Sequence, residues 1–210
     1  MKSYKKLIIL HGILIVLEII ALAHDIRVFG AGMFRYYTID SNVLQLFVSA
    51  CILIYLARGK EYPSLFYVLH LVCAVCLTVT FLIAAFVLAP QEGFAYYFLS
   101  DVAPINHFLG PVFSVGLFIF TMNRAVIEKR MVFVPAAASL LYGLIALGLN
   151  AAGVLDGPYF FLKVNEVPAA TIVMWFLIIA VMCVVFSAVY MLFRRKAAAH
   201  YIHTKGESHA

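Results

Sequence analysis

The chain has 210 residues, of which 65% are hydrophobic and 12% are charged, and its formal net charge is +5. A mean hydropathy of +1.03 excludes an ordinary soluble globular domain, so the composition predicts an integral membrane protein. The basic residues lie in short segments between apolar runs, where they are better explained by membrane orientation than by nucleic-acid binding. We therefore expect no nucleic-acid partner.

Six apolar stretches approach the roughly 20 residues that a helix needs to cross the bilayer core. They cover residues 7–23, 41–57, 64–89, 102–122, 131–152 and 169–193. The second stretch is short unless its helix begins one turn earlier and already contains Thr38. Because the loops are too short for a second domain, we predict an all-α, polytopic transmembrane bundle of six spans over residues 1–197, followed by a polar C-terminal tail at 198–210.

The distribution of Lys and Arg predicts the orientation of this bundle. Of the 15 Lys and Arg residues, only Arg27, Arg35 and Lys163 fall on one side of the predicted spans, and all the others fall on the opposite side. The positive-inside rule then places both termini in the cytoplasm. The loops after the first, third and fifth spans are predicted to lie outside.

A polar stretch interrupts the apolar sequence at the start of the second predicted span. Thr38, Ser41, Asn42 and Gln45 occur at i, i+3, i+4 and i+7, so their side chains share one helix face. Polar groups are costly in hydrocarbon, so this face should point into the protein or a wet cavity. A threonine before a helix is more often an N-cap, and Asp40 or Ser41 also suits that role.

His107 lies at the outer end of the fourth predicted span. Gly110, Pro111 and Ser114 follow it at i+3, i+4 and i+7, and Pro111 cannot donate a backbone hydrogen bond toward residue 107, which opens space beside the imidazole. The second and fourth spans both run from outside to inside, so Thr38 and His107 should lie at similar depth in the outer half of the membrane. A hydroxyl and an imidazole are the groups that nucleophilic catalysis requires.

In these residues the chain resembles the androgen-induced protein family of polytopic membrane hydrolases, which includes bacterial relatives. The resemblance rests on Tyr37-Thr38, with Gln45 one helical repeat later, and on Asn106-His107. It implies a threonine hydrolase that cleaves fatty-acid esters of hydroxy fatty acids within the membrane, with Thr38 as nucleophile and His107 as general base. For this compact chain we expect a bacterial plasma membrane, with the site toward the outer leaflet.

Supporting roles fall to several neighbouring polar residues. Asn106 or Asn42 would orient the imidazole or donate to the oxyanion, and Asp40 and Asp101 are alternatives for the orienting role. Arg35 would receive a substrate carboxylate or contact lipid headgroups. The sequence has no metal cluster, phosphate-binding glycine loop or nucleotide motif, so we expect no metal and no cofactor.

Other functions stay open at this point. Ser41 competes with Thr38 as a nucleophile one turn along the same face, and acyl transfer to another lipid would use the same Thr/His pair. A non-enzymatic transporter, lipid sensor or scaffold would instead use intramembrane charges such as Glu18. The chain shows no internal repeat, which weighs against the common inverted-repeat transporters. The expected partner is a lipid or fatty-acid ester within the membrane.

Overall fold

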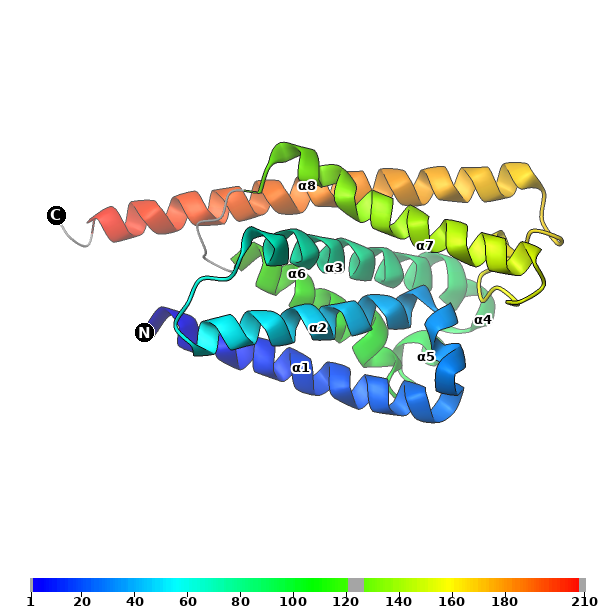
Figure 1. The fold of residues 1–210 in the computed structure, drawn as a ribbon, viewed down its shortest axis with the longest axis horizontal. Helices are drawn as coiled ribbons and strands as arrows, with labels where there is room; N and C mark the ends of the chain where they lie inside the picture. The colour runs from blue at the N-terminus through cyan, green and yellow to red at the C-terminus, as the bar shows by residue number, and fades with distance from the viewer. Residues whose placement is uncertain (1, 121–126, 208–210) are drawn as a thin grey trace.

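The computed structural model describes residues 2–120 and 127–207, and every regular element within these two ranges is helical (Figure 1). The prediction of an all-α bundle is therefore confirmed. The elements are α1 (Lys2–Phe29), η1 (Gly30–Arg35), α2 (Tyr37–Ala57), α3 (Ser64–Ile83), η2 (Ala84–Leu88), α4 (Ala89–Glu92), α5 (Phe94–Phe98), η3 (Ile105–Leu109), α6 (Gly110–Phe120), η4 (Lys129–Phe133), α7 (Val134–Ala151), η5 (Phe160–Leu162) and α8 (Ala169–Glu207).

The long helices run side by side in alternating directions, and α1 begins at the same end of the bundle at which α8 ends (Figure 1). Helix α3 lies in the middle, where it contacts α2, α6, α7 and α8. It is the most buried of the long helices. Its sequence is apolar all round, which is the pattern of a helix that has neighbours on every side.

Five helical segments in the described ranges are long and apolar enough to cross a membrane: Tyr4–Arg35, Tyr37–Ala57, Ser64–Glu92, Lys129–Ala151 and Ala169–Ala198. A sixth apolar segment, Ile105–Phe120, is shorter. Large apolar side chains are exposed on the outer helices, where water would disfavour them and lipid would not. The chain is an integral membrane protein.

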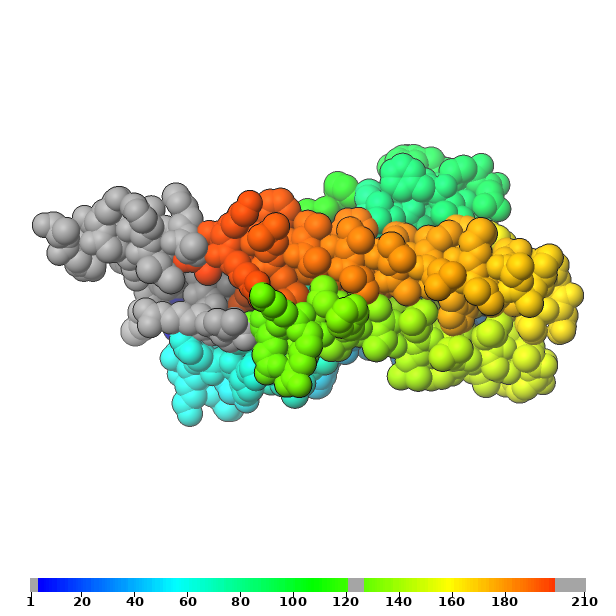
Figure 2. All heavy atoms as spheres, turned by 90° about the horizontal axis from the view of Figure 1, so that it is seen from above, coloured from blue at the N-terminus to red at the C-terminus, as the bar shows by residue number. Residues whose placement is uncertain are grey.

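Helix α8 lies along one long face of the molecule beside α7 (Figure 2). Val173, Leu177, Val181 and Val185 are exposed at intervals of four residues and form an apolar stripe suited to lipid contact. The helix continues past residue 197, where we predicted the bundle to end and a polar tail to begin. Residues 194–199 are all Arg, Lys or Ala, which are strong helix formers and explain this continuation.

The second and fourth predicted spans begin differently: the second begins as a regular α-helix and the fourth begins with a π-helical turn. Helix α2 begins at Tyr37 and contains Thr38, as predicted from the length of its apolar stretch. The fourth predicted span begins with the π-helical turn η3 and continues as α6, so its start is not a regular α-helix. The predicted end of that span and the basic residue Arg124 lie outside the described residues.

The polar face of α2 points into the protein, as predicted. Gln45 Nε2 donates to Ser49 Oγ at 2.7 Å, and Ser114 Oγ of α6 donates to Gln45 Oε1. His11 Nδ1 of α1 lies 3.3 Å from Ser49 Oγ. All four side chains are fully buried. This network satisfies polar groups that would otherwise be costly inside a membrane, and it ties α1, α2 and α6 together.

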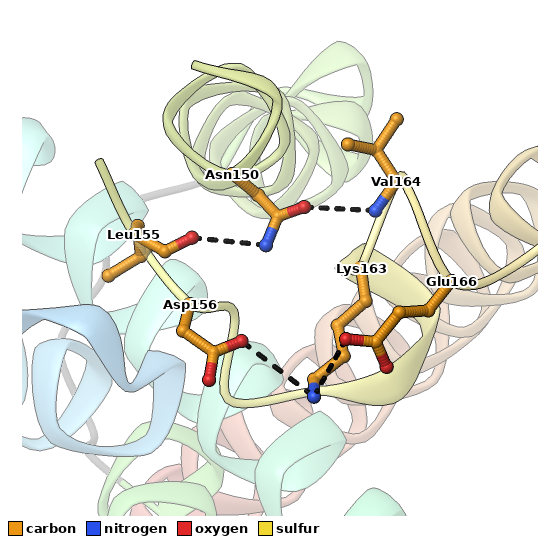
Figure 3. Close-up of polar contacts among 6 residues, drawn as sticks. All are labelled: Asn150, Leu155, Asp156, Lys163, Val164 and Glu166. Carbon is orange, nitrogen blue, oxygen red and sulfur yellow. Dashed lines mark hydrogen bonds and ion pairs between the residues drawn. The ribbon is translucent and has the colours of Figure 1, made fainter. Parts of the chain in front are cut away.

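Asn150 fixes the loop between α7 and α8 (Figure 3). Its Nδ2 donates to the Leu155 carbonyl at 3.0 Å, and its Oδ1 accepts from the Val164 backbone N–H at 2.9 Å. The Asn150 side chain thereby holds Leu155 and Val164, near the two ends of the loop, next to the C-terminal end of α7. The enclosed segment carries Tyr159.

Ion pairs and ring stacking hold the same loop from two further sides. Lys163 Nζ lies 3.7 Å from Asp156 Oδ1 and 3.4 Å from Glu166 Oε1 (Figure 3). Phe161 stacks on Trp175 of α8 with ring centroids 4.9 Å apart. These exposed ion pairs contribute little individually, so burial of the aromatic rings is the stronger restraint on the loop.

Candidate active site

A cavity of about 320 Å³, lined by both apolar and polar side chains, opens at the end of the bundle opposite the chain termini. The ends of α1 and α2, the segment around α5 and η3, and the α7–α8 loop all contribute to its wall. Its polar lining includes His24, Asp25, Thr38, Asp101, Asn106 and His107. Thr38 and His107, which are 69 positions apart in the chain, therefore line the same cavity.

A second, smaller pocket of about 50 Å³ adjoins this cavity and shares three lining residues with it. Its lining is mainly apolar and comes from α2, α3, α7, α8 and the α7–α8 loop. Thr38, Leu88 and Tyr159 line both spaces. Thr38 thus borders both the cavity that His107 lines and the apolar pocket.

Thr38 is not the N-cap of its helix. The N-cap is Tyr36, which has extended backbone angles and makes no side-chain cap hydrogen bond. Thr38 lies in the first turn, half-buried, and its carbonyl accepts a hydrogen bond from Asn42 Nδ2 at 2.9 Å. The capping interpretation of Thr38, Asp40 and Ser41 is therefore wrong, and the Thr38 hydroxyl serves no capping function.

Tyr159 lies beside Thr38 in this structure. Its phenol is buried, it lines both spaces together with Thr38, and polar groups of Tyr37 and Thr38 act on its pKa. Burial raises the pKa of Tyr159 to about 12, although these polar groups lower it in part. The phenol therefore keeps its proton at neutral pH and can donate it in a hydrogen bond beside the threonine.

The imidazole of His107 projects from the π-helical turn η3. Its Nδ1 lies 3.3 Å from the Ala103 carbonyl, which can only accept, so the tautomer with its proton on Nδ1 satisfies this contact and leaves the lone pair on Nε2. The ring packs edge-on against Tyr97 and Phe98, with centroids 5.5 and 6.1 Å away. The Tyr97 backbone also contacts it. Among the described residues no hydrogen bond joins His107 to Thr38.

The two asparagines predicted as supporting residues bond elsewhere. Asn42 Nδ2 donates to the carbonyls of Thr38 and Asn106, at 2.9 and 3.2 Å. Asn106 Nδ2 donates to Asp25 Oδ2 at 3.1 Å. Ala103 is the group that contacts the imidazole Nδ1. Orientation of the imidazole by either asparagine stays a prediction.

The remaining predicted residues lie around the site at different depths. Ser41 is buried, donates to the Tyr37 carbonyl at 2.7 Å and lines neither the cavity nor the smaller pocket. Asp40 is half-buried and also lines neither space. Asp101 is exposed on the cavity wall with a left-handed backbone at φ 43°. The competing nucleophile Ser41 therefore has no direct access to either space.

Arg35 does not line the cavity itself but contacts Tyr36, which does. A guanidinium nitrogen donates to the Tyr36 hydroxyl at 2.8 Å, and the guanidinium lies 4.9 Å from the centre of that ring. Tyr36 lines the cavity, and the Arg35 carbonyl accepts from the Tyr142 hydroxyl at 2.6 Å. Binding of a substrate carboxylate by Arg35 stays a prediction.

Sequence reasoning missed two residues of this site, Tyr159 and Asp25. Tyr159 belongs to an aromatic loop whose sequence suits either an interfacial belt or the rim of a cavity, and no spacing in the sequence connects it to Thr38. Asp25 stands near the C-terminal end of α1, where an aspartate is ordinarily exposed, yet it is only 4% exposed here. Its pairing with Asn106 depends on the packing of α1 against η3.

Comparisons with protein-family models, curated proteins and solved structures found no match to this chain.

Proposed function

We propose that this protein is an intramembrane lipid hydrolase that cleaves fatty-acid esters, such as fatty-acid esters of hydroxy fatty acids. Thr38 would be the nucleophile and His107 the general base. The observation that carries the proposal is the position of Thr38, which borders both the cavity lined by His107 and the smaller apolar pocket. A hydroxyl in such a position can meet an ester carbonyl while the acyl chain enters apolar surroundings.

The first half of the reaction forms an acyl-enzyme. Thr38 Oγ1 attacks the ester carbonyl carbon as His107 Nε2 accepts the hydroxyl proton. The tetrahedral intermediate then collapses, the ester C–O bond breaks, and His107 returns the proton to the departing alkoxide. The bound ester has to bring the two side chains together, because catalytic hydrogen bonds often tighten only in the substrate complex.

The second half releases the fatty acid. A water molecule attacks the acyl-threonine carbonyl, and His107 accepts a proton from that water. Collapse of the second intermediate breaks the bond to Thr38 Oγ1, which takes the proton back from the imidazole. The products are a hydroxy acid and a free fatty acid, and both free side chains are regenerated.

Tyr159 supplies a hydrogen-bond donor beside the reacting carbonyl in this scheme. We expect Tyr159→Phe to lower kcat by about 10²-fold, the scale observed when one oxyanion donor is removed. Tyr96→Phe is the matched control, since Tyr96 is exposed on the same cavity wall and should lose little activity. Steady-state ester hydrolysis measures both. If Tyr159→Phe is fully active, the Tyr159 hydroxyl has no part in catalysis and the ring contributes packing only.

We also propose the membrane placement that the basic residues favour. The bundle crosses a bacterial plasma membrane six times, with the shorter segment Ile105–Phe120 as the fourth span and both termini in the cytoplasm. The Thr38–His107 cavity then faces the outer leaflet. A lipid ester would reach it from that leaflet by passing Tyr96 and Tyr97, two aromatic residues that line the cavity.

The hydrolase proposal is tested by locating a covalent adduct. The purified protein is treated with an alkyl fluorophosphonate, digested, and sequenced by tandem mass spectrometry. We expect one phosphonyl group on Thr38, with much slower labelling when His107 is replaced by alanine. An adduct on Ser41 would reassign the nucleophile. Absence of labelling together with absence of turnover over a panel of acyl esters would remove the enzymatic proposal and favour a transporter, sensor or scaffold.

The same material distinguishes hydrolysis from acyl transfer. Incubation with a labelled fatty-acid ester in lipid vesicles should release labelled free acid. Appearance of the label in a new lipid ester, with no free acid, would show that another lipid and not water accepts the acyl group from Thr38.

A further inference from the structure

A cluster of buried oxygen atoms lies beside the cavity, between α1, α2 and η3. It contains Glu18, Asp25, Asn42 and Asn106, whose side chains are only 2 to 5% exposed. These residues surround a small space of about 10 Å³, close to the room that one water-sized particle needs. The proposed hydrolysis leaves Glu18 without a role.

Three oxygen atoms in this cluster have no hydrogen-bond partner: Glu18 Oε1, Asn42 Oδ1 and Asn106 Oδ1. Both amide orientations are fixed. Asn42 Nδ2 donates to two backbone carbonyls, and Asn106 Nδ2 donates to the Asp25 carboxylate. Rotating either amide would turn its oxygen against those acceptors. The unpartnered atoms are therefore acceptors, and each is costly to bury alone.

Gly110 shows how closely these acceptors converge. A Cβ atom on Gly110 would lie 2.8 Å from Asn42 Oδ1, 3.0 Å from Glu18 Oε1 and 3.0 Å from the Ile105 carbonyl oxygen. The Ile105 carbonyl already accepts from the Gly110 N–H across the π-helical turn, and its second lone pair remains. Oxygens from α1, α2 and η3 thus meet beside a residue without a side chain.

The cluster contains two carboxyl groups without a matching Lys or Arg in the described part of the chain. Among the described residues no Lys or Arg forms an ion pair with Glu18 or Asp25. His24 Nδ1 lies 3.5 Å from Asp25 Oδ1 and can balance that carboxylate when protonated. One carboxylate, Glu18, is then left inside the bundle, and a charge at this depth requires a counterion or a proton.

We propose that this cluster binds a sodium ion, held by Glu18, Asn42, Asn106 and the Ile105 carbonyl, with Asp25 as the outer carboxylate. The donors are all oxygens, which suit hard cations, and the described residues include no group of three or more His, Cys, Asp or Glu that would select a transition metal. The small space and single unbalanced charge fit a monovalent ion better than Ca²⁺, which takes six to eight oxygens. Backbone carbonyls at helix interruptions coordinate sodium in membrane transporters, and the second lone pair of the Ile105 carbonyl lies at such an interruption.

The test measures binding of radiolabelled Na⁺ to the full-length protein in detergent by scintillation proximity, at constant ionic strength with choline chloride as filler. We expect saturable binding that unlabelled Na⁺ displaces and that K⁺, Ca²⁺ and choline displace weakly. Glu18→Gln keeps the side-chain shape and removes the charge, so affinity should fall at least about tenfold. Binding is independent of ester hydrolysis, and its outcome does not depend on Thr38.

Gly110→Ala provides a second variant with a matched control. Its methyl group would occupy the point where the three oxygens converge, so it should abolish binding. Gly116→Ala lies on the same helix, has nothing within 4 Å of its new Cβ, and should bind like the parent. Size-exclusion profiles establish that each variant is folded. Absence of Na⁺ binding in the parent, or equal binding in Gly110→Ala and Gly116→Ala, would overturn the proposal and leave a water molecule or a protonated Glu18 in the cluster.

Discussion

Thr38→Ala is expected to abolish ester hydrolysis, with turnover falling to the level of the uncatalysed reaction. The hydroxyl is the only group bordering both the cavity and the smaller pocket to which the mechanism assigns bond formation, and alanine removes it while keeping a helix-compatible residue in the first turn of α2. Loss of a nucleophile removes covalent catalysis as a whole, so at least about a thousandfold decrease in kcat is expected. Release of labelled fatty acid from vesicle-embedded ester measures it.

Two matched variants separate chemistry from structure at this position. Thr38→Ser retains the hydroxyl and should retain a measurable fraction of kcat. Ser41→Ala removes a buried hydroxyl that bonds only to the Tyr37 carbonyl, and it should leave kcat within a few-fold of the parent. If Thr38→Ala hydrolyses esters normally and Ser41→Ala does not, the nucleophile lies one turn further along α2 and the proposed mechanism is wrong.

His107→Ala should lower kcat by about 10²- to 10⁴-fold, the usual contribution of a general base. Without the imidazole, no group in the mechanism takes the proton from Thr38 or returns it to the leaving alkoxide. KM should change much less, because Tyr97, which packs against the imidazole, still forms part of the cavity wall in the variant. Steady-state kinetics of the variant measure both parameters, and added imidazole should restore part of kcat.

His24→Gln is the control for this prediction. His24 lines the same cavity, but its Nδ1 faces Asp25 at 3.5 Å and it has no assigned part in the proton transfers. Its replacement should cost less than tenfold in kcat. Equal losses in the two histidine variants would indicate that cavity polarity, and not a base at position 107, controls turnover.

Local sequence was sufficient for the helical architecture and for the start of α2. The short apolar stretch at 41–57 required an earlier helix start, and α2 does begin at Tyr37. The helical period of Thr38, Ser41, Asn42 and Gln45 predicted an inward face, and the last three side chains are buried. These predictions succeeded because hydrocarbon penalises exposed backbone and polar side chains along the whole helix.

The partners of the site residues could not be predicted in the same way. Each depends on the placement of segments far apart in the chain: Tyr159 beside Thr38, Asp25 beside Asn106, and Glu18 beside Gly110. Spacing along one helix defines which side chains share a face, but it carries no information about the atom opposite that face. The π-helical turn adds a further shift, since it rotates the residues after it relative to a regular helix.

The sequence alone determined that this is a helical membrane protein with a polar face on α2 and a histidine just before α6, because composition and periodicity act locally. Only the tertiary structure decided that Thr38 and His107 line one cavity, that Tyr159 contacts the threonine, and that Asn42 and Asn106 bond to backbone and carboxylate instead of the imidazole. The physical reason is that a buried polar group takes whichever partner the packing of several helices brings within hydrogen-bonding distance.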